Sequence, residues 1–229
     1  MAKSKIKIDV VSDIVCPWCY IGKRRLEKAI DQLKNEFEFE IQYHPFELNP
    51  NVPAEGFDQK AYLIKKFGGE ARYHELIGNV TRVAAQEGLN FDYSKQSKSP
   101  NTLNLHRVSW LAGKEGKQLQ TVEAFFHAYF EKGTDLSQTE NIIVVAKESG
   151  LDEIKVRILL EGNEGSEEMK SEQIHNRELG VTGVPFYIIN DKYAVSGAQP
   201  VALFVQAFKD ISSKYSVEGE ACDADGNNC

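Results

Sequence analysis

Two cysteines three residues apart, Cys16 and Cys19, enclose a proline and a tryptophan in the stretch VCPWCY. Such a pair is found in structural disulfides, in metal sites and in pairs of reactive thiols. Four cysteines in 229 residues are too few for a disulfide scaffold. Zinc would also need Cys222 and Cys229, whose six-residue gap lies outside the usual close pair spacing. The pattern therefore favours reactive thiols, and we expect no metal site.

The elements around the cysteines would activate the first of them. Alternating apolar residues predict a strand over 5–11, and apolar residues at helical spacing predict a helix over 17–35. Cys16 would then lie at a helix N-terminus, where free N–H groups and the helix dipole lower the pKa of a thiol. Cys19 would lie one turn further along the same face. We expect Cys16 to attack a disulfide and Cys19 to resolve the mixed disulfide that forms.

Two further features would shape the site. Pro17 suits the first helical turn, because its missing N–H costs nothing there, and Trp18 offers an apolar surface beside the sulfur. In the stretch GVTGVPFYIIN, Pro185 follows Val184 at the start of a predicted strand over 184–190. From the residues alone this proline simply opens a strand, since X–Pro bonds are cis in only ~5–6 % of cases.

The rest of the chain predicts a small sheet with a large helical insertion. A second alternating strand covers 37–46, so we expect a parallel pair with a helical crossover. Helical spacing dominates between residues 58 and 165. A further helix over 166–180 precedes two strands joined by a tight turn at 191–192, and a helix over 200–215 closes the pattern. The helical segments of the insertion are 61–68, 73–88, 104–116, 121–133, 140–150 and 155–162.

Composition narrows the class of protein. The apolar fraction of 41 % and the charged fraction of 27 % are ordinary for a soluble globular chain. With a net charge of −7 and no Lys/Arg-rich block, the chain gives no sign of nucleic-acid binding. No apolar run is long enough to cross a membrane, and the first 15 residues lack the apolar core of a signal peptide. We therefore expect a cytoplasmic protein without a membrane partner.

From about Lys5 to Tyr215 the chain resembles the DsbA-like branch of the thioredoxin superfamily, and most closely the FrnE group. The resemblance rests on SDIVCPWCYIGKRRLE, the inserted helices and GVTGVPFYIIN. It implies an α/β protein whose thioredoxin fold is interrupted by a large all-helical insertion. It also implies a cis Pro185 against the cysteines, and a Val184 backbone that pairs with the substrate peptide.

The resemblance also implies a division of the chain. Residues 1–57 and 166–215 would form a discontinuous thioredoxin-like domain, and residues 58–165 would form the inserted helical domain. Residues 216–229, which are polar and rich in glycine, would form a flexible tail.

FrnE-like proteins can carry a second cysteine pair at the C-terminus. Cys222 and Cys229 would match it, and we expect them to exchange with, or cap, the Cys16–Cys19 disulfide. An incidental bridge within the tail is the alternative.

Other members of the superfamily give a rival interpretation. Kappa-class glutathione transferases and 2-hydroxychromene-2-carboxylate isomerases carry serine in place of Cys16 and use glutathione. The stretch NTLNLHRVSWLA resembles a run in both groups, so its polar residues would either face the active site or only cap and solvate a helix. These residues are Asn101, Thr102, Asn104, His106 and Arg107.

We therefore expect a thiol–disulfide oxidoreductase that acts on proteins bearing disulfides or thiols. Its cycle requires no metal or organic cofactor, and glutathione is the one cofactor that the resemblance leaves open. The alternatives are a glutathione-dependent isomerase or transferase, and a redox-linked chaperone or binding module.

Overall fold

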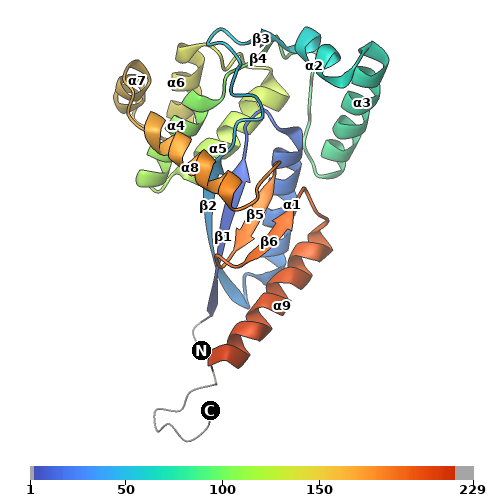
Figure 1. The fold of residues 1–229 in the computed structure, drawn as a ribbon, viewed down its shortest axis with the longest axis vertical. Coiled ribbons are helices and arrows are strands. Elements are labelled where there is room, and N and C mark those ends of the chain that lie inside the picture. Colours follow the sequence, from blue (N-terminus) through green and yellow to red (C-terminus); the bar gives the residue numbers. More distant parts are fainter. Residues whose placement is uncertain (1–2, 220–229) are drawn as a thin grey trace, which may run out of the picture.

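The computed structural model describes residues 3–219. Within this range four strands form one sheet in the order β2-β1-β5-β6 (Figure 1). β1 (Ser4–Ser12) pairs parallel with β2 (Phe37–Pro45) and antiparallel with β5 (Phe186–Ile189). β6 (Tyr193–Ser196) pairs antiparallel with β5 at the other edge. The predicted parallel pair and the predicted hairpin are both confirmed.

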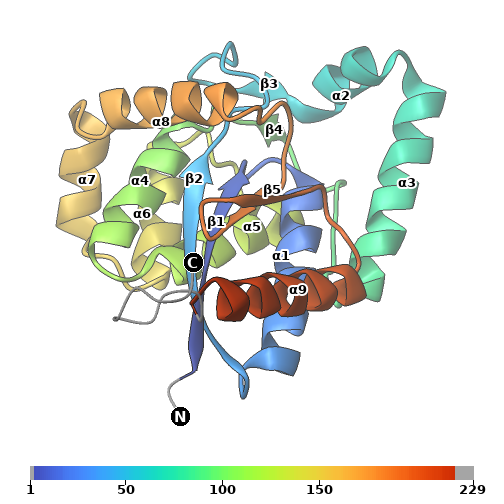
Figure 2. The ribbon, with the colours of Figure 1, turned by 60° about the horizontal axis from the view of Figure 1, so that its bottom comes forward.

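Helices α1 (Pro17–Leu33) and α9 (Val201–Gly219) lie side by side on one face of the sheet (Figures 1 and 2). Phe39 on β2 contacts Phe208 on α9, with ring centroids 5.2 Å apart. Ile6 is the register partner of Phe39, so its side chain lies on the same face of β1. The alternation that predicted both strands therefore reflects burial beneath these two helices.

The helices between β2 and β5 form a lobe at one end of the sheet, in the upper part of Figure 1. Three of them, α4, α5 and α8, contact β2. One cluster of buried apolar side chains continues from the sheet into this helical lobe. No helix in the described range is long and apolar enough to cross a bilayer. The lobe contains α2 (Gln59–Phe67), α3 (Glu70–Gln86), α4 (Leu103–Lys114), α5 (Gln118–His127), α6 (Thr139–Glu148), α7 (Glu153–Glu161) and α8 (Ser166–Glu178).

The lobe differs from the prediction in two places. β3 (Phe57–Asp58) pairs with β4 (Lys98–Ser99), and strands of two residues are too short to leave a pattern in the sequence. The helix expected over 121–133 changes at Ala128 into the π-helix η1 (Ala128–Lys132). The carbonyls of Tyr129 and Phe130 accept hydrogen bonds from the segment 92–96, and these tertiary bonds accompany the wider turn.

The hairpin and the last helix also differ in detail from the prediction. Three residues, not two, separate the paired residues Ile189 and Tyr193. Asn190 and Asp191 have φ values of 50° and 56°, a conformation that Asn and Asp adopt more readily than other side chains. Helix α9 continues to Gly219, four residues beyond its predicted end.

Gly22 lets α1 lie close to β5, and a substitution there tests this packing. A Cβ at Gly22 would overlap the Tyr187 hydroxyl oxygen and lie 3.1 Å from Pro185 Cγ. We expect Gly22→Ala to lower the free energy of unfolding by about 1–3 kcal/mol in urea titrations, because the site is overpacked. Gly78→Ala on α3 is the matched control, since no atom lies within 4 Å of its added Cβ. It should stabilise the protein by up to about 1 kcal/mol. Equal stability of the two variants would contradict this description of the packing.

Candidate active site

The two thiols lie at the start of α1, where the sequence placed them. After β1 ends at Ser12, the Cys16 N–H donates to Asp13 O and the Cys19 N–H donates to Cys16 O, both at 3.0 Å. Cys16 is the N-cap residue, with φ −90° and ψ 110°, and Pro17 is the first helical residue. No acidic side chain lies in the first turn of α1. The helix dipole therefore favours negative charge beside Cys16.

A segment 168 residues away completes the setting of Cys16. The Cys16 thiol donates to the Val184 carbonyl at 3.6 Å, and the Val184–Pro185 peptide bond is cis, in agreement with the resemblance. Cys16 is only 4 % exposed, whereas Trp18 beside it is 38 % exposed. The structure thus brings the two sequence motifs together and leaves a narrow approach to the first sulfur.

Cys19 lies deeper, at 2 % exposure. Burial raises the pKa of Cys19 well above its usual range, and a hydrogen bond with Cys16 and the charge of Cys16 raise it further. The Ser12 hydroxyl and the Asp13 N–H act in the opposite direction. Burial of Cys19 therefore disfavours its thiolate.

An apolar cavity of ≈ 200 Å³ opens beside Pro17 and Trp18, and we call it the Trp18 pocket. Its walls come from the segment after β2, from α2 and α3, and from η1. It places an apolar surface of the helical lobe next to the residues between the two cysteines. Apolar side chains of its wall are Leu48, Leu63, Phe67, Ile77, Val80 and Phe130.

Among the residues proposed from the stretch NTLNLHRVSWLA, His106 reaches the active-site turn. Its Nε2 lies 3.1 Å from Phe46 O and 3.7 Å from Asp13 Oδ1. Asp13 is 1 % exposed, and its carboxylate accepts a hydrogen bond from Leu48 N–H at 2.8 Å. Asp13 and His106 therefore connect the start of α1, the segment after β2 and α4. The sequence analysis did not single out Asp13.

The other residues of that stretch serve mainly the lobe itself. Asn101 donates to Val52 O, and Asn104 accepts from Arg107. Arg107 is buried and donates to the carbonyls of residues 159, 162 and 164 at the end of α7. Thr102 lines the Trp18 pocket. An active-site role for Asn101 and Asn104 stays a prediction.

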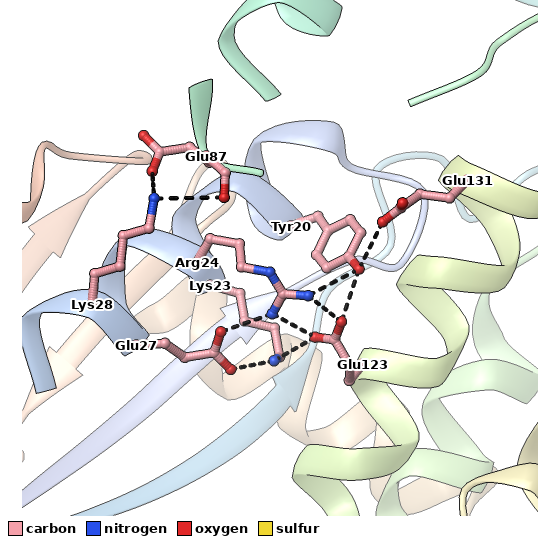
Figure 3. Close-up of polar contacts among 8 residues, drawn as sticks. All are labelled: Tyr20, Lys23, Arg24, Glu27, Lys28, Glu87, Glu123 and Glu131. Atoms are coloured by element: carbon pink, nitrogen blue, oxygen red, sulfur yellow. Dashed lines mark hydrogen bonds and ion pairs between the residues drawn. The ribbon is translucent and has the colours of Figure 1, made fainter. Parts of the chain in front are cut away.

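A polar network that the sequence analysis missed ties α1 to the lobe (Figure 3). The Tyr20 hydroxyl donates to Glu123 Oε1 at 2.8 Å and lies 3.2 Å from Glu131 Oε1. Arg24 binds Glu123 through both terminal nitrogens, and the buried Lys23 pairs with the same carboxylate. Because Glu123 belongs to α5 and Glu131 to η1, the helix that carries the thiols is anchored to the lobe.

Electrostatics keep Glu123 charged in this network. Burial disfavours the carboxylate, but hydrogen bonds and charges from Arg24 and Lys23 outweigh it and hold the pKa of Glu123 at about 2. Glu123 is the one acidic residue within the apolar helical run TVEAFFHAYF. This position is the only feature of the sequence that suggests a buried, paired carboxylate. Its partners lie about 100 residues away, so the pattern could not name them.

Within residues 3–219 no group of three His, Cys, Asp or Glu side chains is arranged to hold a metal ion. Cys222 and Cys229, the predicted second pair, lie outside the described residues.

Known proteins resemble this chain in sequence and in fold. A family model described as a DSBA-like thioredoxin domain matches residues 7–209. The uncharacterized protein YwbO of Bacillus subtilis (strain 168) is 26 % identical over 210 residues, which cover 91 % of this chain and 98 % of YwbO. A probable DsbA oxidoreductase from Streptomyces coelicolor is 30 % identical in its crystal structure, with a TM-score of 0.85 and 91 % of each chain covered.

Two solved structures of lower identity share the fold. A 2-hydroxychromene-2-carboxylate isomerase is 17 % identical, with a TM-score of 0.68 and coverage of 92 % of this chain and 98 % of its own. The cytosolic disulfide reductase DsbM from Pseudomonas aeruginosa, solved with GSH, is 12 % identical, with a TM-score of 0.65 and coverage of 91 % and 99 %. The expected thioredoxin fold with a helical insertion is confirmed.

The network around Glu123 predicts how stability depends on pH. A carboxylate whose pKa is depressed in the folded state stabilises the protein above its unfolded pKa, and this contribution is lost as the pH falls. For Glu123 the window runs from about 4.5 down to about 2. We expect Glu123→Gln to lower the free energy of unfolding at pH 7 by about 1–3 kcal/mol, because Arg24 and Lys23 lose a charged partner.

Urea titrations from pH 7 to pH 2 would measure both effects. The variant should lose less stability than the wild type between pH 4.5 and pH 2. Glu148→Gln is the matched control, since its carboxylate is exposed and lies 3.8 Å from Lys132, and it should change stability by less than about 1 kcal/mol. A wild-type pH profile retained by Glu123→Gln would contradict the assignment.

Proposed function

The chain is a member of the DSBA-like thioredoxin domain family, and from this premise we propose that it is a thiol–disulfide oxidoreductase whose reactive pair is Cys16 and Cys19. One observation carries the proposal. Two free thiols lie at one helix N-terminus, with the first against Val184 O and the second buried behind it. This arrangement supports attack on the substrate by the first sulfur and resolution by the second, which is the more deeply buried of the two.

Reduction of a substrate disulfide balances with the enzyme dithiol and solvent alone, and a second thiol compound must then reduce the Cys16–Cys19 disulfide to complete a cycle. The Cys16 thiolate attacks one sulfur of a substrate disulfide, and the other substrate sulfur leaves and takes a proton from solvent. Cys19 then loses its proton to solvent and attacks Cys16 Sγ, so that the bond to the substrate breaks and the second substrate thiol is released. Two electrons pass from the enzyme dithiol to the substrate disulfide. The reverse sequence oxidises a substrate dithiol, and neither direction needs a metal or an organic cofactor.

The surroundings of the thiols favour a polypeptide substrate. The Val184 carbonyl accepts the Cys16 thiol in the structure, and a peptide N–H is a donor of the same kind that could take its place. The Trp18 pocket offers an apolar volume of ≈ 200 Å³ next to Pro17 and Trp18, enough to bury an apolar side chain near the reacting cysteine of the substrate. Placement within the FrnE group, the proposed domain boundaries and a cytoplasmic location stay predictions.

A glutathione-dependent reaction is the second candidate. The observation that favours it is the shared fold of the isomerase structure and of DsbM, which was solved with GSH. At 17 % and 12 % identity these matches support the fold alone. The presence of Cys16 and Cys19 together favours dithiol chemistry, because that chemistry uses both sulfurs.

Replacing each cysteine separately tests the proposal. In the reduction of insulin by dithiothreitol, followed by turbidity, Cys16→Ser should lower the rate to that of dithiothreitol alone, because the attacking sulfur is lost. Cys19→Ser should instead accumulate a mixed disulfide between Cys16 and the substrate, visible on non-reducing gels, because nothing resolves it. An unchanged rate in Cys16→Ser would rule out the proposal.

The same variant separates the alternatives. Glutathione-dependent turnover that survives Cys16→Ser would favour the isomerase or transferase class. Suppression of aggregation that survives it would favour a chaperone that binds partners without redox chemistry.

The relay by Cys222 and Cys229 is a separate proposal. It is supported by the sequence, since these are the only other cysteines and they lie close together near the C-terminus. Under mild oxidant, mass spectrometry of peptides should find disulfides that link Cys222 or Cys229 to Cys16 or Cys19, which an incidental bridge within the tail would not give. A tail pair that stays reduced while Cys16–Cys19 closes would rule out the relay.

A further inference from the structure

β2 forms one edge of the described sheet, and β1 is the only strand that pairs with it there (Figure 1). Near the end of β2, the Tyr43 N–H donates to Gln118 Oε1 at 2.8 Å, and Gln118 Nε2 donates to the Tyr43 carbonyl at 2.9 Å. This side-chain amide takes the place of a residue in a neighbouring strand. The backbone N–H and C=O of Tyr43 therefore point away from β1.

The two-residue period of a strand gives Ile41 and Phe39 the same orientation as Tyr43. The Phe46 N–H, three positions beyond Tyr43, donates to Ser12 O next to the end of β1, in agreement with this alternation. No second strand pairs with the outer side of β2 in the part of the chain that the structure describes. The backbone N–H and C=O groups of Ile41 and Phe39 are therefore available to a further strand.

A groove of ≈ 610 Å³ runs along this edge, and we call it the β2 groove. One wall is β2 itself over residues 40–45, and the other is formed by the end of α4 and the start of α5. Leu119 in the second wall is 39 % exposed, which is unusual for an apolar side chain of its size. A strand bonded to Ile41 and Phe39 would enter this groove and would end at Gln118.

β1 shows which kind of strand β2 binds on its inner side. On the face of the sheet beneath α1 and α9, Ile6 and Ile8 are the register partners of Phe39 and Ile41. Both isoleucines are at most 1 % exposed. The apolar row of β2 thus lies beside an apolar row of the strand that it binds.

The opposite face of β2 is acidic. Lys5 and Lys7 on β1 are the register partners of Glu38 and Glu40. Lys5 Nζ lies 2.6 Å from Glu40 Oε2. Glu38 and Glu40 are both exposed, so a strand on the outer side could also reach their carboxylates. Lysine alternating with isoleucine is therefore the pattern that complements β2 on both faces.

Charge argues against two other occupants of this edge. In a two-fold pair of β2 strands from two copies of the chain, the glutamates of one copy would face those of the other. Like charges opposite each other destabilise a sheet. The residues that follow Gly219 include Glu220, Asp223 and Asp225 but no lysine or arginine, so this segment does not complement β2 either.

We propose that the outer edge of β2 binds an extended segment of a partner protein in which apolar residues alternate with lysine or arginine. The segment adds a strand to the sheet, and its backbone bonds to Ile41 and Phe39. Its apolar side chains continue the row of these two residues, and its basic side chains pair with Glu38 and Glu40. This surface does not include the thiols, so the inference goes beyond the proposed function and does not depend on it.

The chain's own β1 sequence supplies the probe, because β2 already pairs with this pattern. A capped, fluorescein-labelled peptide KSKIKIDV, the sequence of residues 3–10, is titrated with the full chain at low ionic strength, and fluorescence anisotropy is measured. We expect saturable binding. A peptide with glutamate in place of each lysine should bind about 10-fold more weakly or not at all, because it places like charges beside Glu38 and Glu40.

Two N-methylated forms of the peptide test for strand pairing. Each form carries methyl groups on alternate backbone nitrogens, and the two forms differ in which set is methylated. Only one set of N–H groups faces β2 in an added strand. One form should therefore lose binding and the other should retain it, whereas attraction by charge alone would leave both forms bound.

Substitutions in β2 test the same edge from the side of the protein. Ile41→Pro removes the outward N–H, a change that an edge strand tolerates, and should weaken peptide binding about 5-fold. Glu38→Lys should also weaken it about 5-fold at low ionic strength, and less in high salt. Glu161→Lys on α7 is the matched control, since it makes the same change of charge at an exposed residue outside the β2 groove. Cys16→Ser should bind the peptide as the wild type does, so failure of the proposed redox function would leave this result unchanged.

Three outcomes would overturn the inference. One is equal binding of the lysine and glutamate peptides, and another is equal binding by wild type and Glu38→Lys. The third is a dimer of the full chain, seen by sedimentation velocity, that Ile41→Pro dissociates, because the edge would then bind a second copy. In the first two cases β2 would be a free edge whose glutamates only hinder unwanted pairing.

Discussion

The position of the Cys16 sulfur, between the N-terminus of α1 and the carbonyl of Val184, is the constraint on which the rest of the structure depends. The helix end and the carbonyl favour different protonation states of this sulfur. The dipole of α1 favours an anion at the helix end, whereas a carbonyl oxygen accepts the S–H of a thiol and repels a thiolate. A substrate N–H that bonded to the Val184 carbonyl would reduce its repulsion of a Cys16 thiolate. Substrate binding would then favour ionisation of the thiol.

Holding the sulfur there requires three chain segments to meet. The cysteines follow directly after β1. β5 begins directly after Pro185 and pairs with β1 through Val11 and Phe186. This register sets Val184 opposite the turn that starts α1. Gly22 then allows α1 to approach Tyr187 more closely than any side chain would permit. β1 is paired with β2 on one edge and with β5 on the other, and this limits how far the residues around Cys16 can move.

The helical lobe has a separate part in this arrangement. It anchors α1 through Glu123 and Glu131, and it supplies most of the wall of the Trp18 pocket. Proteins whose names describe different reactions share this overall fold at 17 % identity or less. A sheet that presents the reactive group and a lobe that surrounds it would let the substrate change while the fold is kept. Under the proposed function, thiol chemistry would belong to the end of β1 and the start of α1, and selection of the substrate would belong to the lobe.

The sequence alone determined the features that depend on neighbours along the chain. The strand before Cys16, the helix that begins at Pro17 and the spacing to Cys19 follow from local periodicity and from the conformation of proline. Its resemblance to a known family added the cis Pro185 and the helical insertion. Only the tertiary structure decided which distant groups meet the thiols: the Val184 carbonyl, the Trp18 pocket and the carboxylate of Glu123. Contacts between residues 100 or more positions apart depend on packing of the whole chain, and no local pattern carries them.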